Sequence, residues 1–523
     1  MRNLKYAFIP VCLLLITLFI FGCENGPEET APPPQTSAPV TETEATETEP
    51  ELIRVFNKLY PADTAEIVLS SAEITSFDGL LSALKQFSGL SVIDLTDHEL
   101  TVEEKQRLKD AFPGAEIKCR AYAVLQDKKI YADETEIDLS GDLNVSELKA
   151  VLSYLPDVKT VRSDSVIPLD DKEDLIRSFP GVSFDVTGEC EIYGIKVTDK
   201  TEEIDLKGKE VDVNQLITYL KRLPAIKKAD LHGQGFNPVE QTALAEEFPD
   251  VHFLWEVTIL GKKYDSETED LDLSDKKELT ADMMRQAIPL MKGLKRVDMS
   301  DCGSTNEELA ALREEFPGVK IVWRIHMLRW STKTDAIAFS DLIRDYDYQR
   351  LTDEDIQCLK YCTDLQALDL GHQAITDISV ICDYLPELRI LILADNKIKD
   401  LSPVTKLKHL HYIELFVNPN LKDVSPLGEC KELVDVNISY LDINDISALL
   451  DLPLVERFWI EHTHVPENQI NQLRERHPDA TVISVGSGSV DQGWRTHPRY
   501  YAMKDMYNKQ YYMSEEFSKY DGK

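Results

Sequence analysis

Pairs of cysteines and histidines are the residues of this sequence whose spacing could support metal or disulfide chemistry. The chain has nine cysteines, enough for disulfides in an exported protein or for a metal site. Neither histidine pair is accompanied by the cysteines or carboxylates of a known metal site, so we expect loop and surface histidines and no metal. The pairs are Cys358 with Cys362, His409 with His411, and His462 with His464.

Catalytic motifs are absent from the sequence. It contains no Gly-x-Ser-x-Gly, no glycine-rich phosphate loop and no helical His-Glu-x-x-His. The 93 aspartates and glutamates are scattered, so they single out no acid and base. We therefore predict no catalytic residues, no cofactor and no enzymatic activity. The formal net charge of -36 also argues against a nucleic-acid partner, because phosphates select lysine and arginine surfaces.

The N-terminus has the order of features of an export signal. Arg2 and Lys5 precede the apolar run AFIPVCLLLITLFIFG, which Cys23 follows directly. This stretch resembles a bacterial lipobox, in which a small residue such as Gly22 precedes the cysteine. The resemblance implies that residues 1–22 are a signal peptide and that a diacylglyceryl group is attached to Cys23. The alternatives are an ordinary signal peptide and a short membrane helix with an accidental cysteine.

The residues after Cys23 have the composition of a tether. Residues 24–50 are rich in proline, threonine and glutamate and contain no lysine, arginine or aromatic residue. They cannot bury enough apolar surface to fold, so we predict a disordered linker over residues 23–52. With the lipobox, this predicts an extracytoplasmic protein that is lipid-anchored to the bacterial cell membrane, at the cell surface.

A short phrase, Leu-x-x-Leu-x-Leu, is repeated at intervals of 22 or 23 residues in the C-terminal half. A turn such as Lys399-Asp400-Leu401-Ser402-Pro403 follows most copies. The phrase resembles the leucine-rich repeat of the short, internalin-like bacterial type, in five units over residues 364–485. Its copies begin at Leu365, Leu388, Leu410, Leu433 and Val455.

The resemblance implies an α/β solenoid with a parallel concave sheet and a helical or irregular convex side. The physical argument agrees, because a short strand buries its fourth and sixth positions and a second apolar cluster closes each coil, so that neighbouring coils stack. No single coil would be stable alone.

A longer repeat precedes the short ones. Phrases such as Glu136-Ile137-Asp138-Leu139 recur 67 residues apart, and a Phe-Pro pair marks the same place in each copy. Alternating residues after Phe-Pro indicate an extended strand, and LGKKYD at 260–265 looks like a hairpin turn. We predict four long repeats with hairpin insertions over residues 53–335 and a transition segment over 336–363. Ser163 stands where a buried leucine is expected, so the second long repeat is predicted to be irregular.

The register of the coils predicts the environment of several polar residues. Cys362, Cys382 and Cys430 fall in columns that other coils fill with leucine or valine, so we interpret them as buried free thiols rather than as disulfide or metal residues. Cys302, Asn396 and Asn418 occupy the ninth position, where the family accepts Asn or Cys to bond the backbone of the turn.

The third, fifth and seventh positions of each coil must point away from the core, toward the concave face on which leucine-rich proteins commonly bind. A solvated face would not need so many large apolar residues together, so we predict that they anchor a partner. The alternative is that the C-terminal tail or another coil covers them. The predicted partner-binding residues are Ile390, Ile392, Tyr412, Glu414, Phe416, Asn437, Tyr440, Arg457, Trp459 and Glu461.

The end of the chain, residues 486–523, changes character. A Gly-Ser-Gly-Ser joint at 486–489 leads into an aromatic and basic segment that includes Arg495, Arg499, Lys504 and Lys509. It is either a docking segment for a wall polymer or a partner chain, or a cap that folds back over the last coil; we favour the cap, because an open solenoid end exposes core.

These observations predict a lipid-anchored extracytoplasmic protein that uses its concave face for protein–protein interaction. A cell-envelope structural spacer and a polysaccharide-binding module are the alternatives. A spacer would have a featureless concave face, and a polysaccharide-binding module would have aromatic residues stacked along one line.

Overall fold

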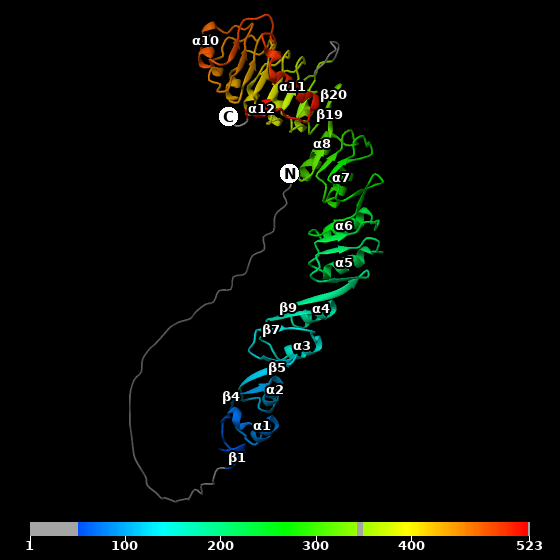
Figure 1. Cartoon of the computed structure of the whole chain (residues 1–523), viewed down its shortest axis with the longest axis vertical. Helices are drawn as coiled ribbons and strands as arrows, with labels where there is room; N and C mark the ends of the chain where they lie inside the picture. The colour runs from blue at the N-terminus through cyan, green and yellow to red at the C-terminus, as the bar shows by residue number, and fades with distance from the viewer. Residues whose placement is uncertain (1–50, 342–348, 521–523) are drawn as a thin grey trace, which may run out of the picture. The chain divides into compact units, whose positions relative to one another are not determined.

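The computed structural model describes residues 51–341 and 349–520. The predicted signal peptide, Cys23 and all but the end of the linker lie outside the described residues. By its contacts the chain divides into two compact units, residues 1–124 and 125–523, and each is described by itself (Figure 1). Within the described residues, no helix is long and apolar enough to cross a membrane.

The first unit has a hairpin followed by strands that alternate with helices. Strand β4 pairs in parallel with both β3 and β5. All three strands therefore run in the same direction, and each helical segment returns the chain to the end of the sheet at which the next strand begins. The helices bury Leu80, Leu84 and Leu108 against Ile93 and Leu95 of the sheet. The elements are β1 (Leu52–Val55), β2 (Lys58–Pro61), β3 (Glu66–Val68), η1 (Ser71–Glu73), α1 (Phe77–Leu84), β4 (Val92–Thr101), α2 (Val102–Ala111) and β5 (Glu116–Leu125).

The long repeats of the second unit follow the same plan. Each sheet has three parallel strands with helices between them. The strands are β6 (Lys128–Tyr131), β7 (Glu136–Leu139), β8 (Thr160–Pro168), β9 (Ser183–Ile192), β10 (Ile195–Thr198), β11 (Glu203–Asp205), β12 (Lys228–Asp230), β13 (His252–Leu254), β14 (Glu256–Ile259), β15 (Lys262–Asp265), β16 (Asp270–Asp272), β17 (Arg296–Asp298), β18 (Lys320–Val322), β19 (Arg324–Met327) and β20 (Trp330–Lys333). The helices are α3 (Val145–Leu152), α4 (Leu169–Ser178), α5 (Val213–Arg222), α6 (Pro238–Glu247), α7 (Ala281–Ala287), η2 (Ile288–Leu290) and α8 (Asn306–Glu315). The sheet of β7, β8 and β9 has a fourth strand, β10, which pairs antiparallel with β9. β6 is instead the last strand of the sheet of β3, β4 and β5.

The predicted hairpins are confirmed. β14 pairs antiparallel with β15 and β19 with β20. Leu260 and Gly261 both have positive φ angles, 49° and 76°, as a two-residue type I′ hairpin turn requires. The alternation from Phe253 to Ile259 is not one strand, however, because β13 ends at Leu254 and belongs to the parallel sheet. The predicted irregularity near Ser163 is also present, as a register shift between Arg162 and Val166 in β8.

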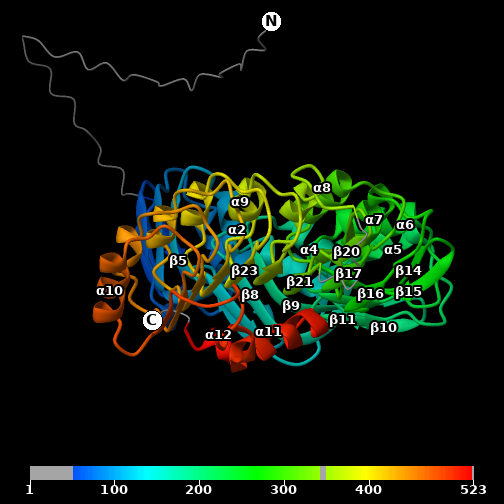
Figure 2. The same cartoon turned by 90° about the horizontal axis from the view of Figure 1, so that it is seen from above.

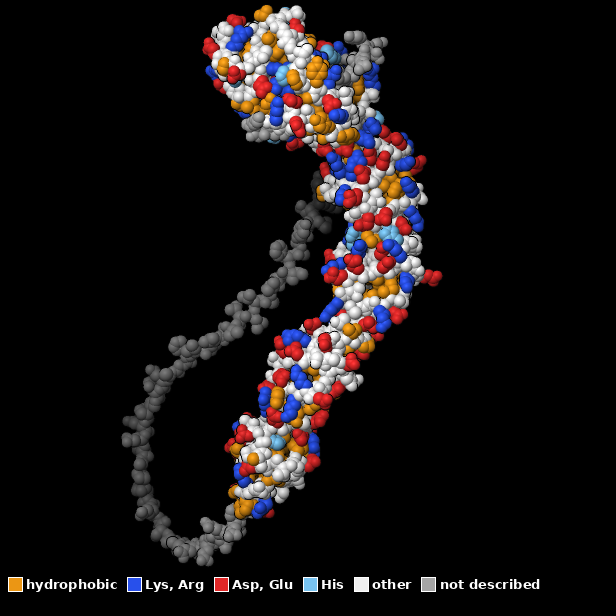
Figure 3. All heavy atoms as spheres, in the orientation of Figure 1, with side chains coloured by type: hydrophobic (Ala, Val, Ile, Leu, Met, Phe, Trp, Pro, Cys, Tyr) orange, Lys and Arg blue, Asp and Glu red, His pale blue; other side chains and the backbone are white. Residues whose placement is uncertain are grey.

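The outward faces of the long-repeat strands carry interleaved charges (Figure 3). Neighbouring coils form ion pairs across these faces, such as Arg162 with Glu136 at 2.7 Å and Arg296 with Asp270 at 3.2 Å. The Arg162–Glu136 pair is largely accessible to solvent, so it contributes little to stability, whereas the Arg296 side chain is 28% exposed and also pairs with the buried Asp335 at 3.0 Å. This face is polar and open, unlike the equivalent face of the short repeats described below.

The short repeats form one parallel sheet of seven strands. The register is in phase, because Leu368, Leu391, Ile413, Val436 and Phe458 are successive partners. The sheet therefore has two strands more than the five predicted phrases: Ala338–Ser340 lies in the predicted transition segment, and Thr481–Ile483 lies at the end of the predicted range 364–485. The strands are β21 (Ala338–Ser340), β22 (Ala367–Asp369), β23 (Ile390–Ile392), β24 (Tyr412–Glu414), β25 (Asp435–Asn437), β26 (Arg457–Trp459) and β27 (Thr481–Ile483).

Short helices form the convex side, and the sequence explains where they begin. The Asp400 carboxylate accepts a hydrogen bond from the backbone N–H of Ser402 at 2.8 Å, and Asp377, Asp423 and Asp445 do the same at equivalent positions. The helices are η3 (Gln357–Tyr361), α9 (Ser379–Tyr384), η4 (Ser402–Lys406), η5 (Ser425–Glu429), η6 (Ser447–Leu449) and α10 (Glu467–Arg476).

The predicted core register is confirmed by burial. Cys362, Cys382 and Cys430 are buried among the core leucines, and they are free thiols. Burial raises the pKa of Cys382 and of Cys430 to about 12, so neither is a reactive thiolate at neutral pH. Asn396 and Asn418 form the expected ladder: each accepts from a backbone N–H, of Ile375 and Ile398 respectively, and donates to two or more carbonyls.

Residues 486–520, here called the C-terminal segment, lie on the inner side of this sheet. The segment contains η7 (Trp494–Thr496), α11 (Pro498–Lys509) and α12 (Glu515–Ser518). Figure 2 shows α11 and α9 on opposite sides of the strands, and α11 contacts β21 and β22. The expectation of a cap over the last coil is therefore wrong about location, because the segment crosses the concave face as far as the first strands.

Candidate functional site

The concave face, formed by the third, fifth and seventh positions of the coils on β21–β27, is the candidate site. The structure brings the predicted residues together on it. It contradicts their expected exposure, because all except Tyr440 are buried under the C-terminal segment. Ile390, Tyr412, Glu414 and Asn437 have no exposed surface, and Trp459 is 1% exposed. Tyr440 lies at the edge, half-buried, with its ring stacked 4.2 Å from that of His462.

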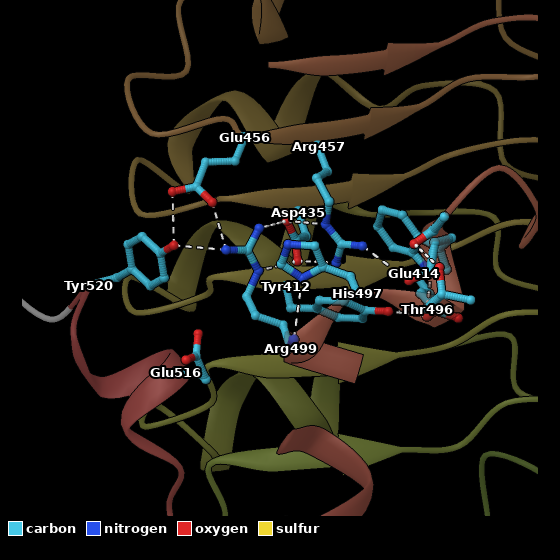
Figure 4. Close-up of polar contacts among 12 residues, drawn as sticks. Tyr412, Glu414, Asp435, Glu456, Arg457, Thr496, His497, Arg499, Glu516 and Tyr520 are labelled. Atoms are coloured by element: carbon cyan, nitrogen blue, oxygen red, sulfur yellow. Dashed lines mark hydrogen bonds and ion pairs between the residues drawn. The ribbon is translucent and has the colours of Figure 1, made fainter. Parts of the chain in front are cut away.

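Asp435 is the centre of the polar contacts. It is fully buried and is held between two guanidinium groups, one from the neighbouring strand and one from the C-terminal segment (Figure 4). Arg457 Nε donates to Asp435 Oδ1 at 2.9 Å, and its Nη2 donates to Oδ2. Arg499 donates from Nε to Oδ2 at 2.8 Å and from Nη2 to Oδ1 at 2.6 Å. Each arginine therefore forms two hydrogen bonds to the Asp435 carboxylate. This bidentate geometry is the strongest arrangement between a guanidinium and a carboxylate.

The remaining Arg499 nitrogen extends this network to Glu456. Arg499 Nη1 donates to Glu456 Oε2 at 2.6 Å and to the Tyr520 hydroxyl at 2.8 Å, and Tyr520 donates to Glu456 Oε1 at 2.8 Å (Figure 4). Burial alone would lower the pKa of Arg499, but the hydrogen bonds to Asp435 outweigh it and the pKa is raised. The charged guanidinium of Arg499 therefore donates to Asp435 along one edge and to Glu456 and Tyr520 from its remaining nitrogen.

Glu414 binds the second anchor, Trp494. The Trp494 indole N–H donates to Glu414 Oε1 at 2.7 Å, and the Tyr412 hydroxyl donates to the same oxygen. The Arg457 guanidinium lies over the Trp494 ring, 4.5 Å from its centroid. Burial and the Glu414 carboxylate raise the pKa of Tyr412 well above its ordinary value, so the hydroxyl stays protonated as a donor.

Three side chains of the sheet bind main-chain carbonyls of the C-terminal segment. Asn437 Nδ2 donates to the Ser489 carbonyl at 2.6 Å, Trp459 Nε1 to the Asp491 carbonyl at 3.2 Å, and Arg457 Nη1 to the Trp494 carbonyl at 3.0 Å. These contacts recognise a peptide backbone and not a particular side chain. They come from strands β25 and β26.

The other half of the interface is apolar. α11 and α12 bury Met503, Met506, Tyr507 and Phe517. These side chains pack in one cluster with concave-face residues Ala338, Ala367, Ile390, Ile392, Ala394, Tyr412, Phe416 and Trp459. The Phe517 ring meets Tyr412 edge-on, with centroids 6.4 Å apart. The large apolar residues noted in the sequence therefore have an intramolecular partner.

Two buried acids lie where α11 meets the first strands. Asp369 accepts from the Ser340 hydroxyl at 3.0 Å and from the Gly371 backbone N–H at 3.1 Å. Burial raises the pKa of Asp369 to about 6. Burial, and then the neighbouring Asp369, raise the pKa of Asp341 well above its ordinary value. This pair differs from Asp435 because, within residues 51–341 and 349–520, no arginine forms a forked pair with either carboxylate.

The packing of the segment leaves some buried polar atoms without a hydrogen bond. Among the described residues, no partner is found for Glu461 Oε2, Asp491 Oδ1, Arg495 Nε or the Tyr507 hydroxyl. Glu461 Oε2 belongs to the concave face, and the other three atoms belong to the segment. The described part of the segment therefore presents no hydrogen-bond donor to this oxygen of Glu461, and a buried acceptor without a donor is unfavourable.

The histidine pairs have ordinary environments, with one correction. His411, expected on the surface, is buried; its Nε2 lies 3.1 Å from Glu432 Oε2, and its ring centroid is 5.7 Å from that of Tyr520. The Tyr520 ring, which follows α12, packs against the His411 ring just before β24. In the part of the chain that the structure describes, no group of three or more His, Cys, Asp or Glu side chains is placed to hold a metal ion.

Sequence reasoning missed the partners of the predicted face. Asp435 stands in the third column beside Arg457 but was not selected, and Arg499, Trp494 and Glu456 were not linked to the face. The available signal was the contrast between a basic, aromatic tail and a strongly acidic chain, together with an acid, Asp435, in a column that begins with apolar residues. No local pattern connects positions so far apart.

Comparison with known proteins agrees with the repeat architecture. A family model described as leucine-rich repeats in two copies matches residues 386–429, the coils of β23 and β24. The fold is a leucine-rich-repeat solenoid with parallel sheets and mixed helices and strands. No curated protein matches the chain.

Solved structures with some likeness include two bacterial proteins. An internalin from Listeria monocytogenes is 14% identical, with 68% of this chain and 84% of that chain covered and a TM-score of 0.25. A leucine-rich-repeat protein from Leptospira interrogans is 15% identical, with 80% and 96% covered and a TM-score of 0.23. With TM-scores this low, nothing about binding is carried over from either protein.

Proposed function

We propose that this protein is a lipid-anchored extracytoplasmic binding protein that uses the concave face of its short repeats for protein–protein interaction. The observation that carries the proposal is that Asn437, Trp459 and Arg457 donate hydrogen bonds to main-chain carbonyls of the C-terminal segment. Side chains that project from a sheet to bind peptide carbonyls form a surface suited to polypeptide. Aromatic and arginine residues at the centre of the face are the types that dominate protein interfaces.

The proposed anchor rests on the lipobox-like sequence at Gly22 and Cys23, and the proposed location rests on the anchor. A tether of about 27 residues between Cys23 and the first strand would hold the folded units near the membrane. Tests of the anchor and of binding are independent, so either part of the proposal can fail alone.

Photo-crosslinking in cells tests the binding proposal. The crosslinking amino acid is placed at Tyr440, the half-buried edge position of the predicted site, and in a matched variant at Lys422, an exposed residue in the turn before η5. We expect an adduct with a protein at position 440 and not at 422. An adduct with polysaccharide would favour the carbohydrate-binding alternative, and no adduct at either position would favour a structural spacer.

A further inference from the structure

We infer that the concave face over β24–β26 is a receptor site for a polypeptide segment that carries an indole and a guanidinium five residues apart, and that residues 489–499 occupy it as an internal competitor. The partner would be a protein segment of the same chemistry as Trp494 and Arg499. This inference rests on the proposed function and adds the class of ligand and the means of its control.

The solenoid is complete without the C-terminal segment. The main hydrophobic core extends from Leu169 to Leu473 and contains no residue of the segment. The segment instead belongs to a separate cluster with the concave-face side chains. Removal of the segment would expose that second cluster but leave the stacked leucines of the coils buried. The segment is therefore a layer on the face and not a part of the core.

The contacts divide into two kinds, as expected for peptide recognition. Asn437, Trp459 and Arg457 bind backbone carbonyls and would bind those of any segment in the same position. Asp435 and Glu414 bind side chains, and so they select among segments. The first kind sets the path of the peptide and the second sets its sequence.

Asp435 selects arginine over lysine. Both oxygens of Asp435 accept from Arg499, at 2.8 and 2.6 Å, and a lysine cannot present two parallel N–H groups. Glu456 and Tyr520 bind the third nitrogen of Arg499. Arg457 compensates the charge of Asp435 on its other side, so the site is built around the planar guanidinium and not around positive charge alone.

Glu414 selects an indole. Its Oε1 accepts from the Trp494 N–H at 2.7 Å, and the ring lies under the Arg457 guanidinium and 5.0 Å from the ring of Trp459. A phenylalanine would fill the space but would leave the Glu414 oxygen with one donor fewer. The spacing between the two selected side chains is fixed because Glu414 and Asp435 stand on adjacent strands.

Two observations indicate that the occupant is exchangeable. Among the described residues, Glu461 Oε2 of the concave face is buried without a hydrogen bond, so a segment that places a donor beside it could gain a bond that the present occupant does not make. The joint to the solenoid is Gly-Ser-Gly-Ser at 486–489, a composition that allows the segment to leave and return. While the internal segment occupies the site, a partner cannot bind. The apparent affinity for the partner is therefore the intrinsic affinity multiplied by the fraction of molecules in which the site is free.

A peptide titration tests the inference with the receptor held constant. The receptor is the full-length chain with Trp494→Ala and Arg499→Ala, which loosen its own segment. The probe is a fluorescein-labelled synthetic peptide of residues 486–520, measured by fluorescence anisotropy. Four peptides are compared: unchanged, Arg499→Lys, Trp494→Phe, and Lys504→Ala as the control, since Lys504 is exposed and its loss tests whether a positive charge outside the site affects binding.

We expect the unchanged peptide and the Lys504→Ala peptide to bind alike, and Arg499→Lys to bind about tenfold more weakly, because one forked pair is lost. Trp494→Phe should weaken binding several-fold. The unaltered chain should bind the unchanged peptide at least about tenfold more weakly than the loosened chain, because its own segment competes. Equal binding of all four peptides, or no binding to a folded loosened chain, would overturn the inference.

Folding of the loosened chain is checked by the resistance of Cys362, Cys382 and Cys430 to alkylation. If that protection is lost, the full-length chain with Arg499→Lys alone serves as the receptor, since it keeps the charge and most of the contacts. If the peptides bind selectively but no protein crosslinks at position 440, the proposed function is contradicted and the inferred peptide site is supported. If a protein crosslinks at position 440 but the peptides bind without selectivity, the proposed function is supported and the inferred peptide site is contradicted.

Discussion

The guanidinium of Arg499 and the carboxylate of Asp435 are 64 residues apart in the sequence and form a buried forked pair, with N–O distances of 2.8 and 2.6 Å. Arg499 is 3% exposed and Asp435 is fully buried. The pair therefore holds the C-terminal segment to the concave face through two charges that neither solvent nor salt can screen strongly. Its contribution to the attachment of the segment can be measured directly.

Arg499→Ala should weaken that attachment by about 3 kcal/mol, the low end for loss of one partner of a buried pair, because Arg457 still compensates Asp435. Hydrogen exchange of the α11 amides measures the change. Arg499→Lys should give a smaller loss, and Lys504→Ala, an exposed change on the same helix, should give almost none. Equal exchange in all three variants would show that the pair does not hold the segment.

Trp459→Ala should destabilise the protein by about 3 to 5 kcal/mol, as expected for a buried tryptophan. Trp459 is 1% exposed and packs on Trp494, with ring centroids 5.0 Å apart. The matched control is Tyr501→Ala, because Tyr501 is 57% exposed and its loss should change the free energy of unfolding by less than about 0.5 kcal/mol. Denaturant unfolding is the measurement; a small effect of Trp459→Ala would contradict the burial.

Asp369 should make stability fall as pH rises. Burial raises the pKa of Asp369 from 3.8 to about 6, so the folded state holds its proton more tightly than the unfolded state. The resulting stability is fully present below pH 3.8 and is lost as pH rises through about 6. Asp341, Glu414, Arg495 and Tyr507 are the other titratable groups of this region.

Asp369→Asn, which keeps the shape of the side chain, should therefore remove this dependence. The variant should be more stable than the unaltered protein by about 3 kcal/mol at pH 8, and the difference should nearly vanish near pH 4. Unfolding by urea at pH 4, 6 and 8 gives the comparison. Parallel pH profiles for the two proteins would exclude Asp369 as the source.

Gly486→Ala should loosen the C-terminal segment, whereas Gly488→Ala should not. A Cβ on Gly486 would overlap Glu461 Oε1 and Gln492 Nε2, but a Cβ on Gly488 would meet nothing closer than 3.9 Å. Since Glu461 is buried, it cannot move away freely, and overpacking of this kind costs about 1 to 3 kcal/mol. The rate of proteolytic cleavage within α11 measures how firmly the segment is attached, and it should be higher in Gly486→Ala than in Gly488→Ala. Equal cleavage rates in the two variants would contradict the prediction.

Cys23→Ser should abolish fatty-acid labelling and either leave unprocessed precursor or release the protein from the membrane fraction, because the lipobox resemblance makes Cys23 the acceptor. Cys12→Ser, a change within the same apolar run, is the control and should leave labelling intact. Metabolic labelling with a fatty-acid probe is the measurement. An unaltered protein that takes up no label would exclude the anchor.

The sequence by itself determined the repeat architecture and the buried columns, because both depend on local periods that recur. Leu365, Leu388 and Leu410 stand 23 and 22 residues apart, and their burial follows from the stacking of similar coils. The same register placed Cys362 in the core and Asn396 in the turn ladder. Hairpins such as β14 with β15 could be predicted because alternation and a Leu-Gly turn are also local signals.

Only the tertiary structure decided what lies on the concave face. Whether Tyr412 and Trp459 meet solvent or protein depends on a segment outside the repeats, and the pairing of Trp494 with Glu414 joins residues 80 positions apart. Such contacts arise from complementary shape and charge, which no periodicity records. The sequence therefore identified the face and its outward residues correctly, and it was wrong about their exposure because burial there is a property of two surfaces in contact.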